Sequence, residues 1–136
     1  MKELIDILHN EELTLIVKSK DGTLHRFGGR GVKDLLTLVT KHPEVLQEAL
    51  IADKIVGKAA AACMIAGGAK QIYADVISEP ALALLQRHDV IIQYGQLANH
   101  IINRAGNGWC PMELLSLEID NPLEIIDKIK DYIIIH

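Results

Sequence analysis

At 136 residues the chain has the length of one domain, and residues 1–136 are expected to form a single α/β domain around one hydrophobic core. Aromatic residues are only 4% of the chain, its formal charge is −4, and no run of Lys or Arg occurs. We therefore expect no nucleic-acid partner. No apolar stretch reaches the roughly 18 residues of a membrane span. The start lacks the features of a signal peptide and the two cysteines, Cys63 and Cys110, lie far apart, which predicts a reduced, cytoplasmic protein without membrane contact.

The N-terminal half of the sequence predicts a helix, a hairpin and a helical region. Alternating apolar and polar residues flank Asp21-Gly22, a pair typical of tight hairpin turns, so two antiparallel strands are expected there. An alanine-rich stretch that ends at Gly67-Gly68 predicts a buried central helix. The expected elements are a helix over 1–10, strands over 13–18 and 23–27, helical pieces over 32–39 and 45–50, and the central helix over 52–66.

The C-terminal half predicts a strand–helix–strand unit followed by further helices. Because a helix separates the two strands, they are expected to lie parallel and to be joined by a right-handed crossover. Pro111 and Pro122 mark the starts of the last helices, since proline suits the first helical position. The expected elements are a strand over 71–77, a helix over 80–88, a strand over 90–94, a short helix over 97–104, a Gly-rich loop over 105–109, and helices over 111–117 and 122–132.

Four blocks of sequence resemble a family of small bacterial proteins, the DUF1893 domain, which is thought to share the fold of cytidine deaminases. The blocks read DKIVGKAAA at 53–61, YADVIS at 73–78, NR at 103–104 and CPME at 110–113. The resemblance implies a cytidine-deaminase-like three-layer α/β/α sandwich, whose mixed sheet begins with the N-terminal antiparallel hairpin. The family has no established activity, so the resemblance implies a fold and not a reaction.

The ligands with which zinc deaminases hold their metal have no counterpart in this sequence. Those enzymes place His-x-Glu at the start of the central helix and Pro-Cys-x-x-Cys at the start of the next one. Here the two helix starts read Gly57-Lys58-Ala59 and, at 78–82, SEPAL. A literal His-x-Glu occurs at His9-Asn10-Glu11, but it stands in another element, and we attribute it to chance. The sequence therefore predicts neither a metal nor a cofactor.

Lys58 is the first candidate for a functional role, because the sequence places it at the N-terminus of the buried helix. The helix dipole and desolvation both disfavour a cation there, so the ammonium group requires an anionic neighbour. That neighbour could be an anionic ligand, for which Gly57 would supply close backbone approach. Equally, Lys58 could pair with Asp53 or extend to solvent, and Asp53 itself is read as an N-cap or turn residue.

Cys110 is the candidate nucleophile, because it precedes Pro111 at a predicted helix start, where a thiolate is stabilised. His100 is the nearest possible base along the chain. The alternative is a structural cap, in which Glu113 reaches back to the backbone N–H of Cys110. Glu113 is therefore either a ligand contact or a capping residue, and both interpretations stay open.

Three further segments could contact an anionic ligand. Arg30 and Gly31 belong to a Gly-rich loop before a helix, where backbone N–H groups and Lys33 could hold a phosphate or carboxylate; the alternative is a simple flexible connection. Ser78 ends a strand of the predicted parallel pair, where ligands collect in open α/β sheets, but it also suits an N-cap. Asn103-Arg104 adds a cation or is a solvated loop end.

Two functions follow from these residues. In the first, a metal-free site binds a small anionic, nucleotide-like molecule, with Cys110 as a nucleophile if a reaction occurs. In the second, the domain is a non-catalytic interaction module that acts through a homodimer or a protein partner, and the Ile-rich end at 133–135 is a strand or patch that awaits cover. Convergence of the candidate residues on one pocket would favour the first function.

Overall fold

The computed structural model describes residues 1–29, 32–102 and 105–135, and in these it contains seven helices and five strands. The N-terminal elements are α1 (Lys2–Asn10), β1 (Leu15–Lys18), β2 (Leu24–Phe27), α2 (Lys33–Lys41), α3 (Pro43–Leu46) and β3 (Leu50–Val56). The C-terminal elements are α4 (Lys58–Gly67), β4 (Gln71–Ser78), α5 (Glu79–Gln86), β5 (Ile91–Ala98), α6 (Pro111–Ser116) and α7 (Pro122–Ile135).

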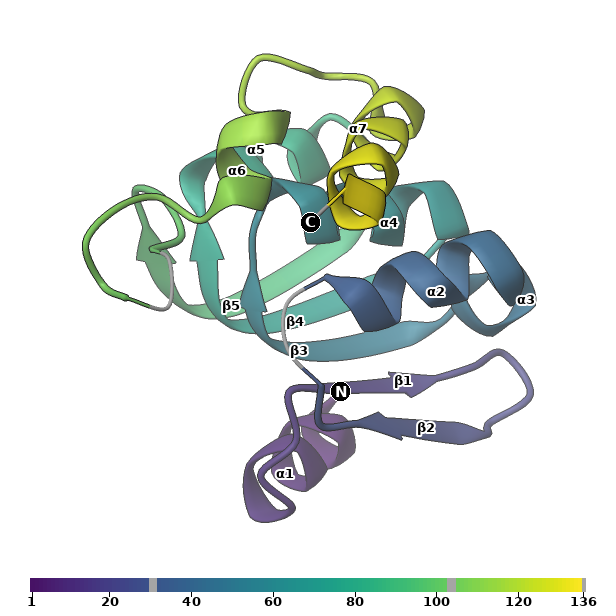
Figure 1. Cartoon of the computed structure of the whole chain (residues 1–136). Helices are drawn as coiled ribbons and strands as arrows, with labels where there is room; N and C mark the ends of the chain where they lie inside the picture. The colour runs from purple at the N-terminus through teal and green to yellow at the C-terminus, as the bar shows by residue number, and fades with distance from the viewer. Residues whose placement is uncertain (30–31, 103–104, 136) are drawn as a thin grey trace.

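The strands form one open, mixed sheet in the order β2-β1-β3-β4-β5. β1 pairs antiparallel with β2 and with β3, whereas β3, β4 and β5 run parallel. Helix α1 covers one face, and the other helices cover the opposite face, with α4 at their centre (Figure 1). The three-layer α/β/α architecture, the N-terminal antiparallel hairpin and the parallel pair of β4 and β5 are thereby confirmed. The further likeness to cytidine deaminases stays a prediction.

Two hydrophobic cores hold the layers together. The larger core lies between the sheet and the main helical layer, and α4 contributes to it mainly small side chains, together with the larger Met64. Its alanines let the helix approach the sheet closely, because they add almost no bulk. The smaller core joins α1 to the other face, where Leu4 and Leu8, one helical turn apart, pack on Ile16, Ala52 and Tyr73.

The segment 50–56 is a strand, so the prediction of helix over 45–50 and 52–66 was wrong in that part. β3 lies between β1 and β4, with Leu15 opposite Asp53 on one side and Ala74 opposite it on the other. Alanine-rich composition favours a helix, but Ile51, Ile55 and Val56 are β-branched and suit a strand. Three consecutive residues of this strand, 51–53, are buried, so it lacks the alternation by which strands are recognised.

Two other expectations are corrected, and the hairpin needs one refinement. β5 continues to Ala98, and the described residues 99–102 form no helix, so the short helix expected over 97–104 is wrong where it can be judged. The isoleucines at 133–135 end α7 and are no strand. In the hairpin turn, Gly22 alone has a positive φ, of 90°, and its N–H donates to the Ser19 carbonyl.

Candidate functional site

A cavity of about 850 Å³ opens where β3 ends and α4 begins. In open α/β sheets this end of a parallel strand is where ligands bind, because the backbone diverges into loops there. The first residues of α2 and α6 and the last of α7 complete the walls. The lining residues are Thr14, Leu15, Gly29, Val32, Lys33, Asp34, Asp53, Lys54, Ile55, Gly57, Ala59, Ala60, Ile101, Ile102, Cys110, Pro111, Met112, Glu113, Tyr132 and Ile133.

Asp53 is a buried acid in the wall of this cavity. Only 8% of the residue is exposed, although it stands in the middle of β3 and not at a cap or turn as expected. Burial raises the pKa of its carboxyl group to about 8, and the charges of Asp75 and Asp34 act in the same direction. The backbone N–H of Ile55, which donates to Asp53 Oδ1 at 3.3 Å, opposes that shift only in part. At neutral pH Asp53 is therefore a neutral hydrogen-bond donor.

Three exposed or half-exposed charges surround this buried acid. Lys33 at the start of α2 and Lys54 in β3 are exposed, and both line the cavity. Asp34 is half-buried and lies so close to Gly29 that a Cβ atom there would stand 2.5 Å from Asp34 Oδ2. The mouth of the cavity thus carries two ammonium groups and one carboxylate, while its wall carries a protonated acid.

Glu113 joins three separate parts of the chain through its buried carboxylate. Oε1 accepts from the Lys58 backbone N–H at 2.9 Å and from the Ser78 hydroxyl at 3.1 Å, and Oε2 accepts from the Ile101 backbone N–H at 2.9 Å. A Cβ at Gly57 would lie 3.3 Å from Glu113 Oε2, so the glycine admits the carboxylate. A side chain of this protein therefore supplies the negative charge at the N-terminus of α4.

The capping role expected for Glu113 within its own helix is wrong. The backbone N–H of Cys110 donates to the Ile101 carbonyl at 2.7 Å, and the carboxylate is used by α4, Ser78 and the segment after β5. Ser78 does cap its helix, since its Oγ accepts from the Ala81 N–H at 3.2 Å. Its hydroxyl is fully buried, and Ser78 is absent from the described lining of the cavity.

The amine of Lys58 points away from the cavity that its neighbours line. Nζ donates to the Leu117 carbonyl at 2.9 Å and contacts Asp120 Oδ1 at 3.4 Å, and only 4% of the side chain is exposed. Asp120 also accepts from Arg87 at 3.1 Å. The ammonium group thus finds its acceptors in the connection between α6 and α7, and the expected alternative partner, Asp53, is not the one used.

Cys110 lines the cavity and is half-buried, whereas Cys63 lies fully inside α4. Burial raises the pKa of the Cys63 thiol to about 12, which leaves it unreactive. His100, the base suggested by the sequence, stacks on Trp109 with ring centroids 4.2 Å apart and is absent from the described lining. The two cysteines therefore differ in access, and only Cys110 can meet a ligand in this cavity.

The cavity brings together Gly57, Cys110 and Glu113 from the predicted site residues, and also Lys33, which the sequence suggested as a further anion contact. It adds Asp53, Lys54 and Asp34, which sequence reasoning did not propose as site residues; a single acid within an apolar strand was the available signal. The predictions at Arg30, Gly31, Asn103 and Arg104 lie outside the described residues. His9 and Glu11 have structural partners elsewhere, Asp75 and Arg26, in agreement with a chance motif.

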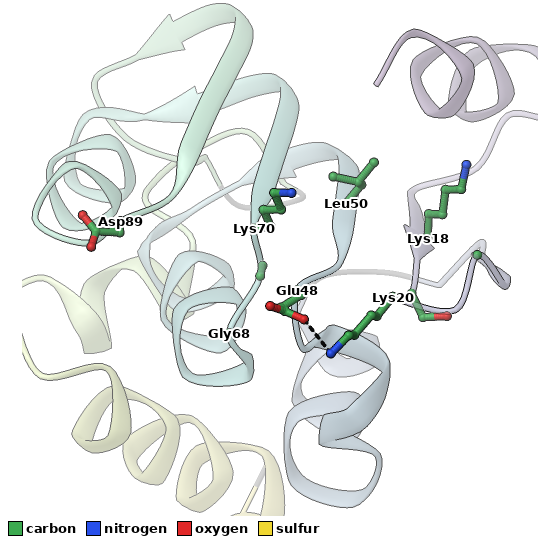
Figure 2. Close-up of a pocket in the computed structure, with 10 residues that line it drawn as sticks. Lys18, Lys20, Glu48, Leu50, Gly68, Lys70 and Asp89 are labelled. Carbon is green, nitrogen blue, oxygen red and sulfur yellow. Dashed lines mark ion pairs between the residues drawn. The ribbon is translucent and has the colours of Figure 1, made fainter.

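A second, smaller cleft of about 590 Å³ lies at the opposite end of the strands (Figure 2). It is lined by Lys18, Lys20 and Lys70 together with Glu48 and Asp89, and Lys20 pairs with Glu48 at 2.9 Å. Most of these charged side chains are exposed, and none is buried. Exposed ion pairs of this kind are weak and solvated, so this cleft is a poorer candidate than the cavity.

In the part of the chain that the structure describes, no three side chains of His, Cys, Asp or Glu are grouped so that they could hold a metal ion. None of the helices described combines the length and the apolarity needed to cross a membrane.

Comparison with known proteins identifies the family. The chain matches the domain of unknown function DUF1893 over residues 3–133. It is also similar to the crystal structure of a DUF1893 family protein from Thermotoga maritima, with 30% sequence identity and a TM-score of 0.87. That match covers 96% of this chain and 88% of the other. No curated protein matches. Family match and structural likeness both extend over almost the entire sequence, and the chain therefore belongs to the DUF1893 family.

Proposed function

We propose that this domain binds a small anionic organic molecule in the cavity at the end of β3. The observation that carries the proposal is the buried acid Asp53 in the wall of this cavity, together with the exposed Lys33 and Lys54 at the mouth of the cavity. A volume of about 850 Å³ suits a molecule of metabolite size, up to a mononucleotide.

The charges around the cavity suggest how the ligand would lie. A carboxylate or phosphate group would face the two ammonium groups at the mouth. A carbonyl or ring-nitrogen acceptor would receive a hydrogen bond from the protonated Asp53, and the apolar body would contact Val32, Ala60 and Met112. Glu113 is already satisfied by three donors, so its role would be to fix the shape of the wall.

Binding, without a chemical step, is the function that this arrangement supports best. Cys110 would contact the ligand, but no histidine belongs to the described lining that could serve it as a base. Lys58 and Ser78, which the sequence suggested as ligand contacts, would act through the fold, because their polar atoms have partners within the protein.

The test is a binding measurement as a function of pH, after a thermal-shift screen of carboxylates and nucleoside monophosphates. Above about pH 8 the wild type should lose affinity about tenfold per pH unit, because ionised Asp53 repels an anion and no longer donates. Asp53→Asn keeps a donor and cannot ionise, so its affinity should stay constant. Cys110→Ser, measured in parallel, controls for the thiol that also lines the cavity. Absence of any binder in the screen would contradict the proposal, as would equal pH profiles of wild type and Asp53→Asn.

The lysines at the mouth allow a matched comparison within one helix. Lys33→Gln, at the cavity end of α2, should weaken binding about tenfold, whereas Lys41→Gln at the other end should leave it unchanged. Equal effects of the two variants would mean that the helix contributes only general charge.

A further inference from the structure

β5 is an edge strand whose side chains lie mostly in solvent. It pairs with β4 only (Figure 1). Six of its eight residues are exposed. Three of them are large and apolar: Ile91 is 58% exposed, Tyr94 41% and Leu97 42%. Among the described residues, no backbone hydrogen bond joins 92–98 to any segment other than β4. Within the described ranges, the outer row of backbone N–H and C=O groups is therefore available for pairing.

The two edges of the sheet differ in how they are protected. The opposite edge, β2, has four residues, and its Arg26 is held by an ion pair with Glu11 at 2.9 Å. β5 is twice as long and contains neither a charged residue nor a proline. Natural proteins protect exposed edges with charges, proline or short strands. A long neutral edge of this kind is typical of a strand that pairs with another chain.

The direction of the side chains on β5 follows from its register with β4. Ile72, Ala74 and Ile77 all belong to the larger core, although regular alternation would place Ile77 on the other face. The alternation of side chains between the two faces is interrupted at Asp75, because this residue is missing from the pairing of β4 with both β3 and β5. Residues paired across a ladder share a face, so the β5 residues opposite those three do so too: Ile92, Tyr94 and Leu97.

We infer that β5 pairs antiparallel with β5 of a second copy, around a two-fold axis between Tyr94 and Gly95. The strand reads Ile-Ile-Gln-Tyr and then Gly-Gln-Leu-Ala. Its second half, read in reverse, matches the first half by type at three of four positions, and only tyrosine and glycine differ. Because the alternation of side chains is interrupted at the middle of the strand, opposite Asp75, the side chains of each pair also lie on one face. The pairs are Ile92 with Leu97, Gln93 with Gln96, Tyr94 with Gly95, and Ile91 with Ala98, each between one copy and the other.

Two features favour a second copy of this chain as the occupant. No like charges meet along the neutral strand, so two copies can pair without repulsion between their side chains. In the inferred register, Asp89, two residues before β5, faces His100 of the other copy, two residues after β5, so a carboxylate lies near an imidazole. The result is one continuous sheet across both copies. Such a narrow interface is expected to give micromolar affinity.

The test is the molar mass of the full chain by light scattering, from about 1 µM to about 500 µM. The wild type should become dimeric within this range. Gln93→Lys combined with Gln96→Lys opposes lysines across the axis and should weaken the dimer at least tenfold. Gln93→Glu combined with Gln96→Lys opposes unlike charges in the inferred register and should restore it. Both positions are exposed, so the fold should survive, which circular dichroism checks.

The control is Leu123→Lys, which places a lysine at a 65% exposed leucine outside the strand and should leave the dimer intact. A wild type that stays monomeric throughout the range would overturn the inference. A dimer that survives the two lysines, or a Glu/Lys variant as dissociated as the double lysine variant, would do so as well. The outcome is independent of ligand binding, because β5 contributes no residue to the described lining of the cavity.

Discussion

Replacing Asp53 with Asn should make the protein more stable at alkaline pH and remove most of the pH dependence that this residue causes. The folded chain holds the carboxyl group where burial raises its pKa from 3.8 to about 8. Above pH 3.8 the unfolded chain releases this proton, whereas the folded chain keeps it until about pH 8. Folding is therefore penalised progressively as the pH rises through this window.

The magnitude follows from the width of the window. Each pH unit between the two pKa values lowers the free energy of unfolding by about 1.4 kcal/mol. Between pH 5 and pH 8, a span of about three units, the wild type should therefore lose about 4 kcal/mol that Asp53→Asn retains. For a chain of this length, that difference corresponds to more than about 10 °C in the midpoint of thermal unfolding.

The assay is urea unfolding of wild type and Asp53→Asn at pH 5 and at pH 8. The measured quantity is the difference in the free energy of unfolding between the two proteins at each pH. Asp21→Asn is the control. Hydrogen bonds from the Ser19 hydroxyl and the Thr23 backbone lower the pKa of this exposed carboxyl to about 2, so it stays ionised in both states across the range. Its effect should not change between pH 5 and pH 8. Parallel pH profiles of wild type and Asp53→Asn would refute the reasoning.

Three more predictions concern the framework of the site. Glu113→Ala should lower the free energy of unfolding by about 3 kcal/mol, because it leaves two buried donors and one half-buried donor unpaired. Glu118→Ala, at an exposed position, should change it by less than about 0.5 kcal/mol in the same urea titrations. Gly67→Ala should cost about 2 kcal/mol by the same assay, since its Cβ would lie 2.6 Å from a packed leucine; an unchanged midpoint would contradict this close contact. Cys110 should be alkylated much faster than Cys63 in the native protein, and a bound ligand should slow it, as mass spectrometry can follow; equal rates would exclude an accessible thiol in the cavity.

The sequence predicts most elements because local patterns identify them. The hairpin alternates around Asp21-Gly22, α1 repeats its leucines one turn apart, and Ser78 precedes a proline at a helix start. Only β3 was assigned the wrong structure as a whole. Its seven residues lie between two strands and two helical layers, so the pattern that distinguishes a strand from a buried helix is absent, and neighbouring alanines favour the helix.

The site was predictable only in part, because it depends on contacts between distant residues. Gly57 and Cys110 were each predicted beside a helix start, and both line the cavity. The acceptors of the Lys58 amine, however, lie about sixty residues away in the chain, as does the Glu113 carboxylate that receives the Lys58 backbone N–H. Asp53 was interpreted as an N-cap or turn residue and not as a site residue, because its segment was assigned to a helix, where an acid near the N-terminus is ordinary. In a buried strand the same residue is conspicuous.

The most direct test of the proposed ligand site is a crystal structure of the protein grown with the acid that binds most tightly in the thermal-shift screen. The ligand should occupy the cavity at the end of β3, with its anionic group near Lys33 and Lys54 and an acceptor atom within hydrogen-bond distance of Asp53. A ligand bound at the cleft between Lys18, Lys20 and Lys70, with the cavity empty, would contradict the account.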